Sequence, residues 1–370
     1  MGFKDLTSKI NRQWLLKSRP EGMISQDQFQ STEVKVPELN QGEVLAKVLF
    51  LSFDPTQRAW MSMDTYIPAV NLGEPMRAGG IAQVVESRHS KFKPGDLVNS
   101  FCGWQDFVVF RPDQPEFVPV TRIPGHLDPK LILALSLTGL TAYFGLLEIG
   151  RPKQGDIVLI SGAAGATGSV AGQIARLKGC KVIGIAGGES KCKWLKNTAK
   201  FDFAIDYKSQ NIAEELDRIC PEGIDVYFDN VGGSITDEVL LRINQKARIV
   251  LCGAISQYNQ EVHDIYGLKN YLSLIINRGS AEGFIILDYL DRALEGLLKL
   301  ISWVESGDVV QEIDLQHGFE NIPATLLRLF NGDNVGKQIL QLAEPPLPVR
   351  SPLLEPTIFK IMQKINMLRR

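Results

Sequence analysis

Cysteine and histidine are scarce in this chain of 370 residues, and the few that occur are dispersed. There are five cysteines, with no Cys-x-x-Cys pair among them, and four histidines. Structural zinc sites place these residues at short spacings, and disulfide frameworks use even numbers of cysteines in small secreted chains. The sequence therefore argues against both kinds of site. We expect no metal, and chemistry that depends on an organic cofactor.

An excess of one charge and a long apolar run are also missing. The chain has 40 Lys and Arg against 42 Asp and Glu, a net charge of -2 at pH 7, so a surface for nucleic acid is not expected. No apolar run reaches the roughly 18 residues of a membrane span. Residues 1–10 are polar and mixed in charge, unlike a secretory signal. These absences predict a cytoplasmic protein without a membrane span.

What the chain does have is a glycine-rich segment, Ser-Gly-Ala-Ala-Gly-Ala-Thr-Gly, at residues 161–168. The apolar run 157–160 before it is typical of a buried strand, and residues 169–177 after it of a helix. A dinucleotide pyrophosphate binds at such a turn, against the backbone amides of the helix N-terminus. The segment therefore predicts a dinucleotide site, although Ala163 takes the place of the first glycine in the usual fingerprint.

Two textures follow one another along the chain. Short strand patterns at residues 44–50, 80–87, 97–98 and 104–110 are broken by glycine and proline, which indicates a barrel-like β domain. From about residue 128, strands and helices alternate, as in a doubly wound parallel sheet, so the predicted fold class is α/β. Strands are expected over residues 157–160, 181–185, 203–205, 226–229 and 247–251, and helices over residues 130–137, 140–149, 211–219, 236–243 and 287–304.

The end of the chain has a third texture. Prolines at 345, 346 and 348 break regular structure, and a helix is expected over residues 357–368. Four apolar side chains would share one face of this helix: Ile358, Ile361, Met362 and Ile365. We expect that face to dock on its own chain or on a dimer partner, with contact to a membrane or another protein as the alternative.

The tip of the second strand in the alternating region bears on the choice of nicotinamide cofactor. NAD sites usually carry an acidic residue about 20 residues beyond the glycine turn. Here residues 186–188 are Ala-Gly-Gly, which leaves space for a 2′-phosphate, and Lys191 can neutralise its charge. Glu189 is a signal for NAD, and a lysine on a surface is commonly only solvated. These residues alone leave both cofactors open.

Two later loops also follow strands and are expected at the carboxyl edge of the sheet, where open sheets bind cofactors. Residues 229–233 read Asp-Asn-Val-Gly-Gly, a pattern that equally suits a plain tight turn. Residues 252–259 contain Tyr258, whose hydroxyl is a hydrogen-bond donor. A loop tyrosine taken alone more often packs than catalyses.

With these residues in view, the chain resembles the zinc-free branch of the medium-chain dehydrogenase/reductase superfamily. Within it, the nearest likeness is to the leukotriene/prostaglandin reductase group, with plant double-bond reductases and bacterial curcumin-reductase-like enzymes. The resemblance covers about residues 11–342. Ordered blocks carry it at residues 11–14, 51–55, 84–87, 140–146, 163–168, 227–233, 252–259 and 334–337.

The resemblance implies a division of the chain and an assembly. A GroES-like β-barrel domain would comprise residues 1–127, with a Rossmann NADP-binding domain inserted at residues 128–303. Residues 304–343 would return to the GroES-like domain. Residues 344–370 form an extension about which the resemblance says nothing. Relatives suggest a homodimer or a larger assembly.

It also implies NADPH as the cofactor and names the residues around it. Gly165, Ala166, Thr167 and Gly168 would hold the pyrophosphate, and Lys191 and Tyr207 the 2′-phosphate. The substrate would lie between the domains near Arg58, Tyr66 and Tyr258. The remaining cofactor contacts would come from Asn230, Cys252, Gly253, Ala254, Ile255, Ser256, Gln257, Tyr258, Phe284, Ile285, Ile286 and Asn334.

The implied reaction is NADPH-dependent reduction of the carbon–carbon double bond of an α,β-unsaturated ketone or aldehyde. Hydride would go to the β-carbon, and the resulting enolate would need stabilisation and a proton. Tyr258 is the candidate for hydrogen-bonding that oxygen. Thr56 stands where many relatives carry a tyrosine, which alters the pocket wall. Quinone reduction and a cofactor-binding redox sensor without turnover are the alternatives.

Overall fold

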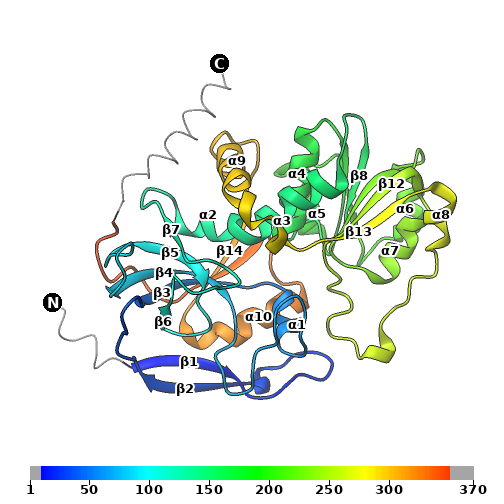
Figure 1. Ribbon diagram of the computed structural model, residues 1–370. Coiled ribbons are helices and arrows are strands. Elements are labelled where there is room, and N and C mark those ends of the chain that lie inside the picture. Colours follow the sequence, from blue (N-terminus) through cyan, green and yellow to red (C-terminus); the bar gives the residue numbers. More distant parts are fainter. Residues whose placement is uncertain (1–9, 351–370) are drawn as a thin grey trace.

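The computed structural model describes residues 10–350 and contains two large sheets of opposite character (Figure 1). One has six strands, all parallel, in the order β10-β9-β8-β11-β12-β13. The other has seven strands, mostly antiparallel, with β14-β15-β3-β4-β5-β7 in order and β6 paired to β3. The α/β fold class is confirmed, with a Rossmann-type sheet and a separate antiparallel-rich sheet.

The parallel sheet is doubly wound, because its strands lie in the order 3-2-1-4-5-6 when numbered along the chain. Its strands are β8 (Ile157–Ile160), β9 (Lys181–Ala186), β10 (Phe203–Asp206), β11 (Ile224–Asp229), β12 (Ile243–Leu251) and β13 (Ser280–Gly283). The helices of this region are α4 (Ala166–Leu177), α5 (Glu189–Asn197), α6 (Ile212–Ile219), α7 (Gly233–Leu240), α8 (Leu272–Asn277) and α9 (Ala293–Glu305). Every residue of β8 is buried, as its unbroken apolar sequence predicts.

The antiparallel sheet contains strands from both ends of the described chain. Its strands are β3 (Val44–Ser52), β4 (Gly79–Ser87), β5 (Leu97–Phe101), β6 (Phe107–Phe110), β7 (Thr121–Ile123), β14 (Ile313–His317) and β15 (Lys337–Gln341). A separate hairpin pairs β1 (Ile10–Leu16) with β2 (Phe29–Lys35). The fully buried ring of Trp104 packs between Phe29 and Phe53, at centroid distances of 4.8 and 5.8 Å. These aromatic contacts form the centre of the β core.

A helical stretch, Pro129–Gly150, links the two regions. It comprises α2 (Pro129–Ala134), a π-helical segment (Leu135–Gly139), α3 (Leu140–Phe144) and a second π-helical segment (Gly145–Gly150). The Asp128 carboxylate caps its start by accepting from Lys130 N at 2.9 Å. Among the described residues this stretch alone is long and apolar enough to cross a membrane, but most of it is buried inside the protein. It is a core helix packed against α4 and α9.

Helices in three places differ from the sequence predictions. Helix α7 ends at Leu240, and residue 243, expected in that helix, instead begins β12 by pairing with Ile224. The helix expected over residues 287–304 is a 3-10 helix, Ile286–Arg292, followed by α9. Tyr289 in that first part stacks on Phe144 at 4.8 Å. The 10-residue helix α10 (Ile322–Asn331) was expected only as short elements. The helix expected over residues 357–368 lies outside the described residues.

The start of the C-terminal extension packs against the antiparallel sheet. The buried side-chain amide of Gln83 donates to Leu347 O and accepts from Leu347 N, both at 2.9 Å. Three residues on, Arg350 N donates to Gly95 O at 2.9 Å. Residues 344–350 therefore form a strap along this sheet, and the buried side chain of Gln83 holds the strap at Leu347.

Candidate active site

The glycine turn after β8 has the geometry of an anion cradle. Gly162 adopts a positive φ of 58°, and Gly165 N donates to Gly162 O at 3.0 Å, which closes the turn. A Cβ at Gly168 would lie 2.5 Å from Gly162 O, so this position excludes any side chain. No side chain caps the N-terminus of α4, which leaves the amides of Ala166, Thr167 and Gly168 available to an anion. Gly162 lies outside the three positions of the usual fingerprint, 163, 165 and 168, so the motif does not single it out.

The residues predicted to hold the 2′-phosphate gather at the tip of β9. A Cβ on Gly187 would lie 2.8 Å from the Tyr207 ring, so the ring covers this glycine directly. Lys191 Nζ donates to Gly332 O at 2.8 Å, and burial together with nearby Lys208 lowers the pKa of Lys191. Two neighbouring ammonium groups repel each other unless an anion lies between them. The tip therefore suits a phosphate.

Glu189, the sequence signal for NAD, is engaged elsewhere. Its carboxylate pairs with Lys193, one helical turn on, at 2.8 Å. Another acidic group at the tip is Asp206, which accepts from Gly188 N at 2.7 Å and from Lys208 N at 3.0 Å. These bonds hold the two strand ends together. The geometry thus weakens the argument for NAD that the sequence left open.

The buried carboxylate of Asp229 shapes the next loop. Its Oδ1 accepts from the hydroxyls of Ser161 at 2.8 Å and Tyr227 at 2.9 Å, and from the amides of Val231 and Gly232, both at 2.9 Å. Asn230 Nδ2 in turn donates to Ser161 O at 2.7 Å. The loop predicted at residues 229–233 is therefore attached to the start of the glycine turn. Asp229 therefore organises this loop, a role that the sequence motif alone does not reveal.

The loop that carries Tyr258 is attached to the same carboxyl edge. Cys252 N and Gly253 N donate to Asp229 O at 2.9 and 3.0 Å, and Ile255 N donates to Asn230 O at 3.2 Å. The Tyr258 hydroxyl accepts from Ala254 N at 3.2 Å. Tyr258 is thereby held with its hydroxyl at the start of its own loop.

Two side chains of this loop, Tyr258 and Cys252, keep their protons at neutral pH because burial raises their pKa values. Burial, above all, raises the pKa of Tyr258, and nearby Tyr66 contributes to the rise. Burial also raises the pKa of Cys252 to about 12. At neutral pH the phenol is therefore a donor, and the Cys252 thiol carries its proton and is no nucleophile.

The antiparallel region supplies the other predicted substrate residues from and near the short helix α1 (Thr56–Trp60). Tyr66 is 44% exposed, its hydroxyl lies 2.9 Å from Thr56 Oγ1, and the partial burial of the residue raises its pKa. Arg58 is only 5% exposed and its Nε donates to Asn259 Oδ1 at 3.0 Å. The structure thus brings both residues to the Tyr258 loop. Tyr66 lies close enough to raise the pKa of Tyr258, and Arg58 is bonded to Asn259, the next residue of the loop.

The remaining predicted residues lie in three places. Asn334 Nδ2 donates to Gly336 O at 3.1 Å, and Gly336 N donates to Ala164 O at 2.9 Å, so Asn334 lies beside the glycine turn. Phe284 packs so closely on Gly145 that a Cβ there would lie 2.3 Å from its ring. Ile285 precedes the 3-10 helix, and Ile286, its first residue, is buried in the core. Ser256 and Gln257 sit in the turn of the Tyr258 loop, bonded to Val231 O and Tyr266 N.

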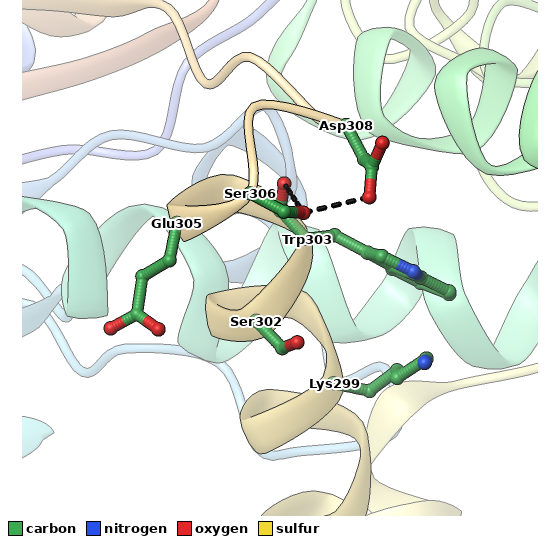
Figure 2. Close-up of a pocket in the computed structure, with 6 residues that line it drawn as sticks. All are labelled: Lys299, Ser302, Trp303, Glu305, Ser306 and Asp308. Carbon is green, nitrogen blue, oxygen red and sulfur yellow. Dashed lines mark hydrogen bonds between the residues drawn. The ribbon is translucent and has the colours of Figure 1, made fainter. Parts of the chain in front are cut away.

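A surface hollow of about 370 Å³ lies elsewhere, at the end of α9 (Figure 2). None of the predicted site residues line it. Trp303 is covered by Lys299, whose Nζ is 5.0 Å from the ring centroid, and Ser306 Oγ donates to Asp308 at 2.7 Å. Its lining residues are Lys299, Ser302, Trp303, Glu305, Ser306 and Asp308.

Comparison with known proteins identifies the family. The chain matches two family models, described as the N-terminal domain of oxidoreductase over residues 12–118 and as zinc-binding dehydrogenase over residues 166–303. Relatives whose names give NADP or NADPH dependence are 36–43% identical to the chain and match about 90% of it. The chain belongs to the zinc-free branch of the medium-chain dehydrogenase/reductase superfamily. The resemblance stated from the sequence is confirmed.

Members of this superfamily resemble the chain over nearly their whole length. NADPH-dependent curcumin reductase of Escherichia coli (strain K12) is 36% identical, over 90% of this chain and 97% of its own. The NADP(+)-dependent 2-alkenal reductase of Nicotiana tabacum is 37% identical, over 90% and 98%. The crystal structure of CurA from Vibrio vulnificus in complex with NADPH superposes with a TM-score of 0.84 at 40% identity, over 90% of this chain and 100% of that one.

Proposed function

We propose that this protein is an NADPH-dependent oxidoreductase that reduces the carbon–carbon double bond of α,β-unsaturated ketones and aldehydes. The observation that carries the proposal is the full-length similarity to a curcumin reductase and to a 2-alkenal reductase, both NADPH- or NADP-dependent by name. A 2-alkenal is an α,β-unsaturated aldehyde. The Tyr258 loop, which is bonded to the loop beside the glycine turn and has Tyr66 nearby, supports the same chemistry.

The residues present fit NADPH. The glycine turn is a cradle that a Cβ at position 168 would fill, and the amides of the first turn of α4 would hold the pyrophosphate. Lys191, with Tyr207 over Gly187, would hold the 2′-phosphate. Asn230 and Asn334 lie beside the turn to complete the site. When bound, the nicotinamide supplies the hydride that the reaction needs.

The chain's own residues would stabilise the charge that develops on the substrate. Hydride addition at the β-carbon leaves an enolate oxygen, which the Tyr258 hydroxyl would stabilise as a donor. The raised pKa of Tyr258 keeps this donor protonated across the neutral range. A proton then adds to the α-carbon, which gives the saturated ketone or aldehyde. Tyr66, held by Thr56, would form the facing wall.

Oxidation of NADPH in the presence of a panel of enals, enones and quinones, with NADH as the control cofactor, tests this function. We expect consumption of NADPH with enals and enones, and a saturated carbonyl product in equal amount by mass spectrometry. Formation of hydroquinone alone would replace the proposal with quinone reduction. Tight NADPH binding without turnover on any acceptor would indicate a cofactor-binding sensor.

We also propose that the protein is a cytoplasmic homodimer with the domain division given above, residues 128–303 being the inserted Rossmann domain. All five cysteines are unpaired thiols, which suits a reducing compartment.

The proposed dimer would form at the edge of the parallel sheet. Strand β13 is an edge strand with all four residues exposed. Beside it, α8 and the loop before it expose Ile265, Leu268, Tyr271, Leu272, Ile275 and Ile276. Pairing with a second copy would cover both the edge and this apolar surface.

A further inference from the structure

The Arg58 guanidinium joins three segments that are far apart in the sequence. Its Nη2 donates to Gly22 O at 2.8 Å and to Pro20 O at 3.4 Å, its Nη1 donates to Ser62 Oγ, and its Nε donates to Asn259 Oδ1. The first two acceptors belong to the loop after β1, and Asn259 belongs to the Tyr258 loop. Four bonds on a nearly buried side chain leave one of the five N–H donors for anything else.

The segment around Gly22 strengthens this connection from its other side. Gly22 N donates to Glu261 Oε1 at 3.0 Å, and Asn259 Nδ2 lies 3.2 Å from the sulfur of Met23. Glu261 also provides a negative charge that favours the Arg58 cation. The loop after β1 therefore holds the Tyr258 loop at two residues, and Arg58 holds both loops.

The other end of the Tyr258 loop is attached to the parallel sheet, through the bonds of Cys252, Gly253 and Ile255 to β11 and its loop. Tyr258 thus lies between two anchors, one at the parallel sheet and the other at α1 and the loop after β1. Helix α1, which carries Arg58, is itself secured by the buried ion pair of Asp54 with Lys337, 2.5 Å long. Lys337 directly follows Gly336, the residue bonded to the glycine turn. The contacts therefore form a closed ring from the turn to α1, to the Tyr258 loop and back to β11.

We propose that Arg58 is a positioning residue for Tyr258, acting through Asn259, and does not bind the substrate. This inference rests on the proposed function and changes the role that the family resemblance implied for Arg58. A displacement of about 1 Å in a reacting group can cost about 100-fold in rate. Lysine cannot replace arginine here, because a single ammonium group cannot span acceptors on two loops and α1.

The test compares Arg58→Lys, Asn259→Ala and the double variant in the full-length protein. We expect each to lower kcat about 10- to 100-fold, with the KM of an enone and the Kd of NADPH changed less than about threefold. The double variant should be no slower than the slower single variant, because both changes break one contact. The pH at which kcat falls on the alkaline side should also shift, because the surroundings of the Tyr258 phenol change. Arg242→Lys, in an arginine that pairs with Asp217 and Glu238 away from the site, is the matched control.

Other outcomes would overturn the assignment. A raised KM with unchanged kcat in Arg58→Lys would place the guanidinium on the substrate, and additive losses in the double variant would separate Arg58 from Asn259. Amide exchange over residues 252–262 gives a readout without substrate, and should be faster in both single variants than in Arg242→Lys. Unchanged exchange would refute the positioning role even if the wild type reduced no enone. Asn259→Ala keeps the test open should Arg58→Lys fail to fold.

Discussion

At the scale of single residues, the site depends on a few donors whose protonation is set by burial. Tyr258 and Tyr66 both have raised pKa values, so each remains a neutral donor where an ordinary tyrosine would begin to ionise. Burial lowers the pKa of Lys191, and its Nζ donates to the carbonyl oxygen of Gly332. The chemistry proposed at each position follows from this protonation state.

Removing the Tyr258 hydroxyl should slow the chemical step. We expect Tyr258→Phe to lower the rate of hydride transfer about 100-fold, the size typical of a lost donor to a developing oxyanion, with the Kd of NADPH nearly unchanged. In the wild type, kcat should stay level beyond the pH at which an ordinary tyrosine ionises and fall only where the phenol of Tyr258, with its raised pKa, loses its proton. Single-turnover kinetics measures both. An unchanged chemical step would remove Tyr258 from the mechanism.

Removing the Lys191 ammonium should weaken selection for the 2′-phosphate. Hydrogen bonds to charged groups contribute about 1.5–3 kcal/mol, so Lys191→Ala should raise the Kd of NADPH roughly 10- to 150-fold and leave that of NADH almost unchanged. Fluorescence titration with both cofactors measures this. Lys193→Ala, which removes the partner of Glu189 one turn away, is the control and should keep the preference for NADPH. Equal losses for both cofactors would refute the assignment.

At the scale of elements, loops and straps are secured by single buried polar side chains. Asp229 organises the loop after β11, and Gln83 on β4 holds the extension at Leu347. Each satisfies several backbone groups that would otherwise be buried without partners. The strap can therefore be tested through the sheet residue that binds it.

Replacing Gln83 should destabilise the protein without affecting the site. Gln83→Leu leaves the amide and carbonyl of Leu347 without their partners, and each such group costs about 1–3 kcal/mol when it stays buried. We expect a lower free energy of unfolding in urea and an unchanged Kd for NADPH. Gln30→Leu, on an exposed position of β2, is the control. Equal stability of the two variants would show that the strap contributes nothing.

At the scale of the whole molecule, two sheets meet along the ring of contacts from the glycine turn to Arg58, while the far edge of the parallel sheet stays uncovered. Ile275 and Ile276 on α8 are each 66% exposed beside that edge. Side chains of this kind seldom remain together in water on a monomer. The edge is thus the surface on which the proposed homodimer depends.

Negative charges introduced on α8, beside that edge, should prevent the proposed dimer from forming. We expect a dimer in light scattering for the wild type, and a folded monomer for the variant with both Ile275→Asp and Ile276→Asp, because buried unpaired carboxylates oppose association. Leu294→Asp, at a 41% exposed position of α9, should remain dimeric. A wild-type monomer at micromolar concentration would contradict the proposal.

The sequence by itself determined those elements whose formation depends on neighbouring residues. The apolar run of β8, the small residues of the turn and the start of α4 are contiguous, so strand, turn and helix followed from residues 157–177. The boundaries that differed, at α7 and before α9, lie where a distant partner prevails: Ile243 pairs with Ile224, and Tyr289 stacks on Phe144. Residue type carries no signal for such partners.

Only the tertiary structure decided which side chains meet. Arg58 and Asn259 are 201 residues apart, and they meet because α1 packs against a loop of the parallel sheet. Lys337 and Asp54 are 283 residues apart, and they meet because β15 pairs with β3 in the antiparallel sheet. The packing of the loop after β1 and of the Tyr258 loop against α1 occupies three of the donors of Arg58. The sequence determined that a dinucleotide turn exists. The fold decided which residues hold Tyr258 beside it, because an arginine has five donors and its sequence neighbours do not specify their acceptors.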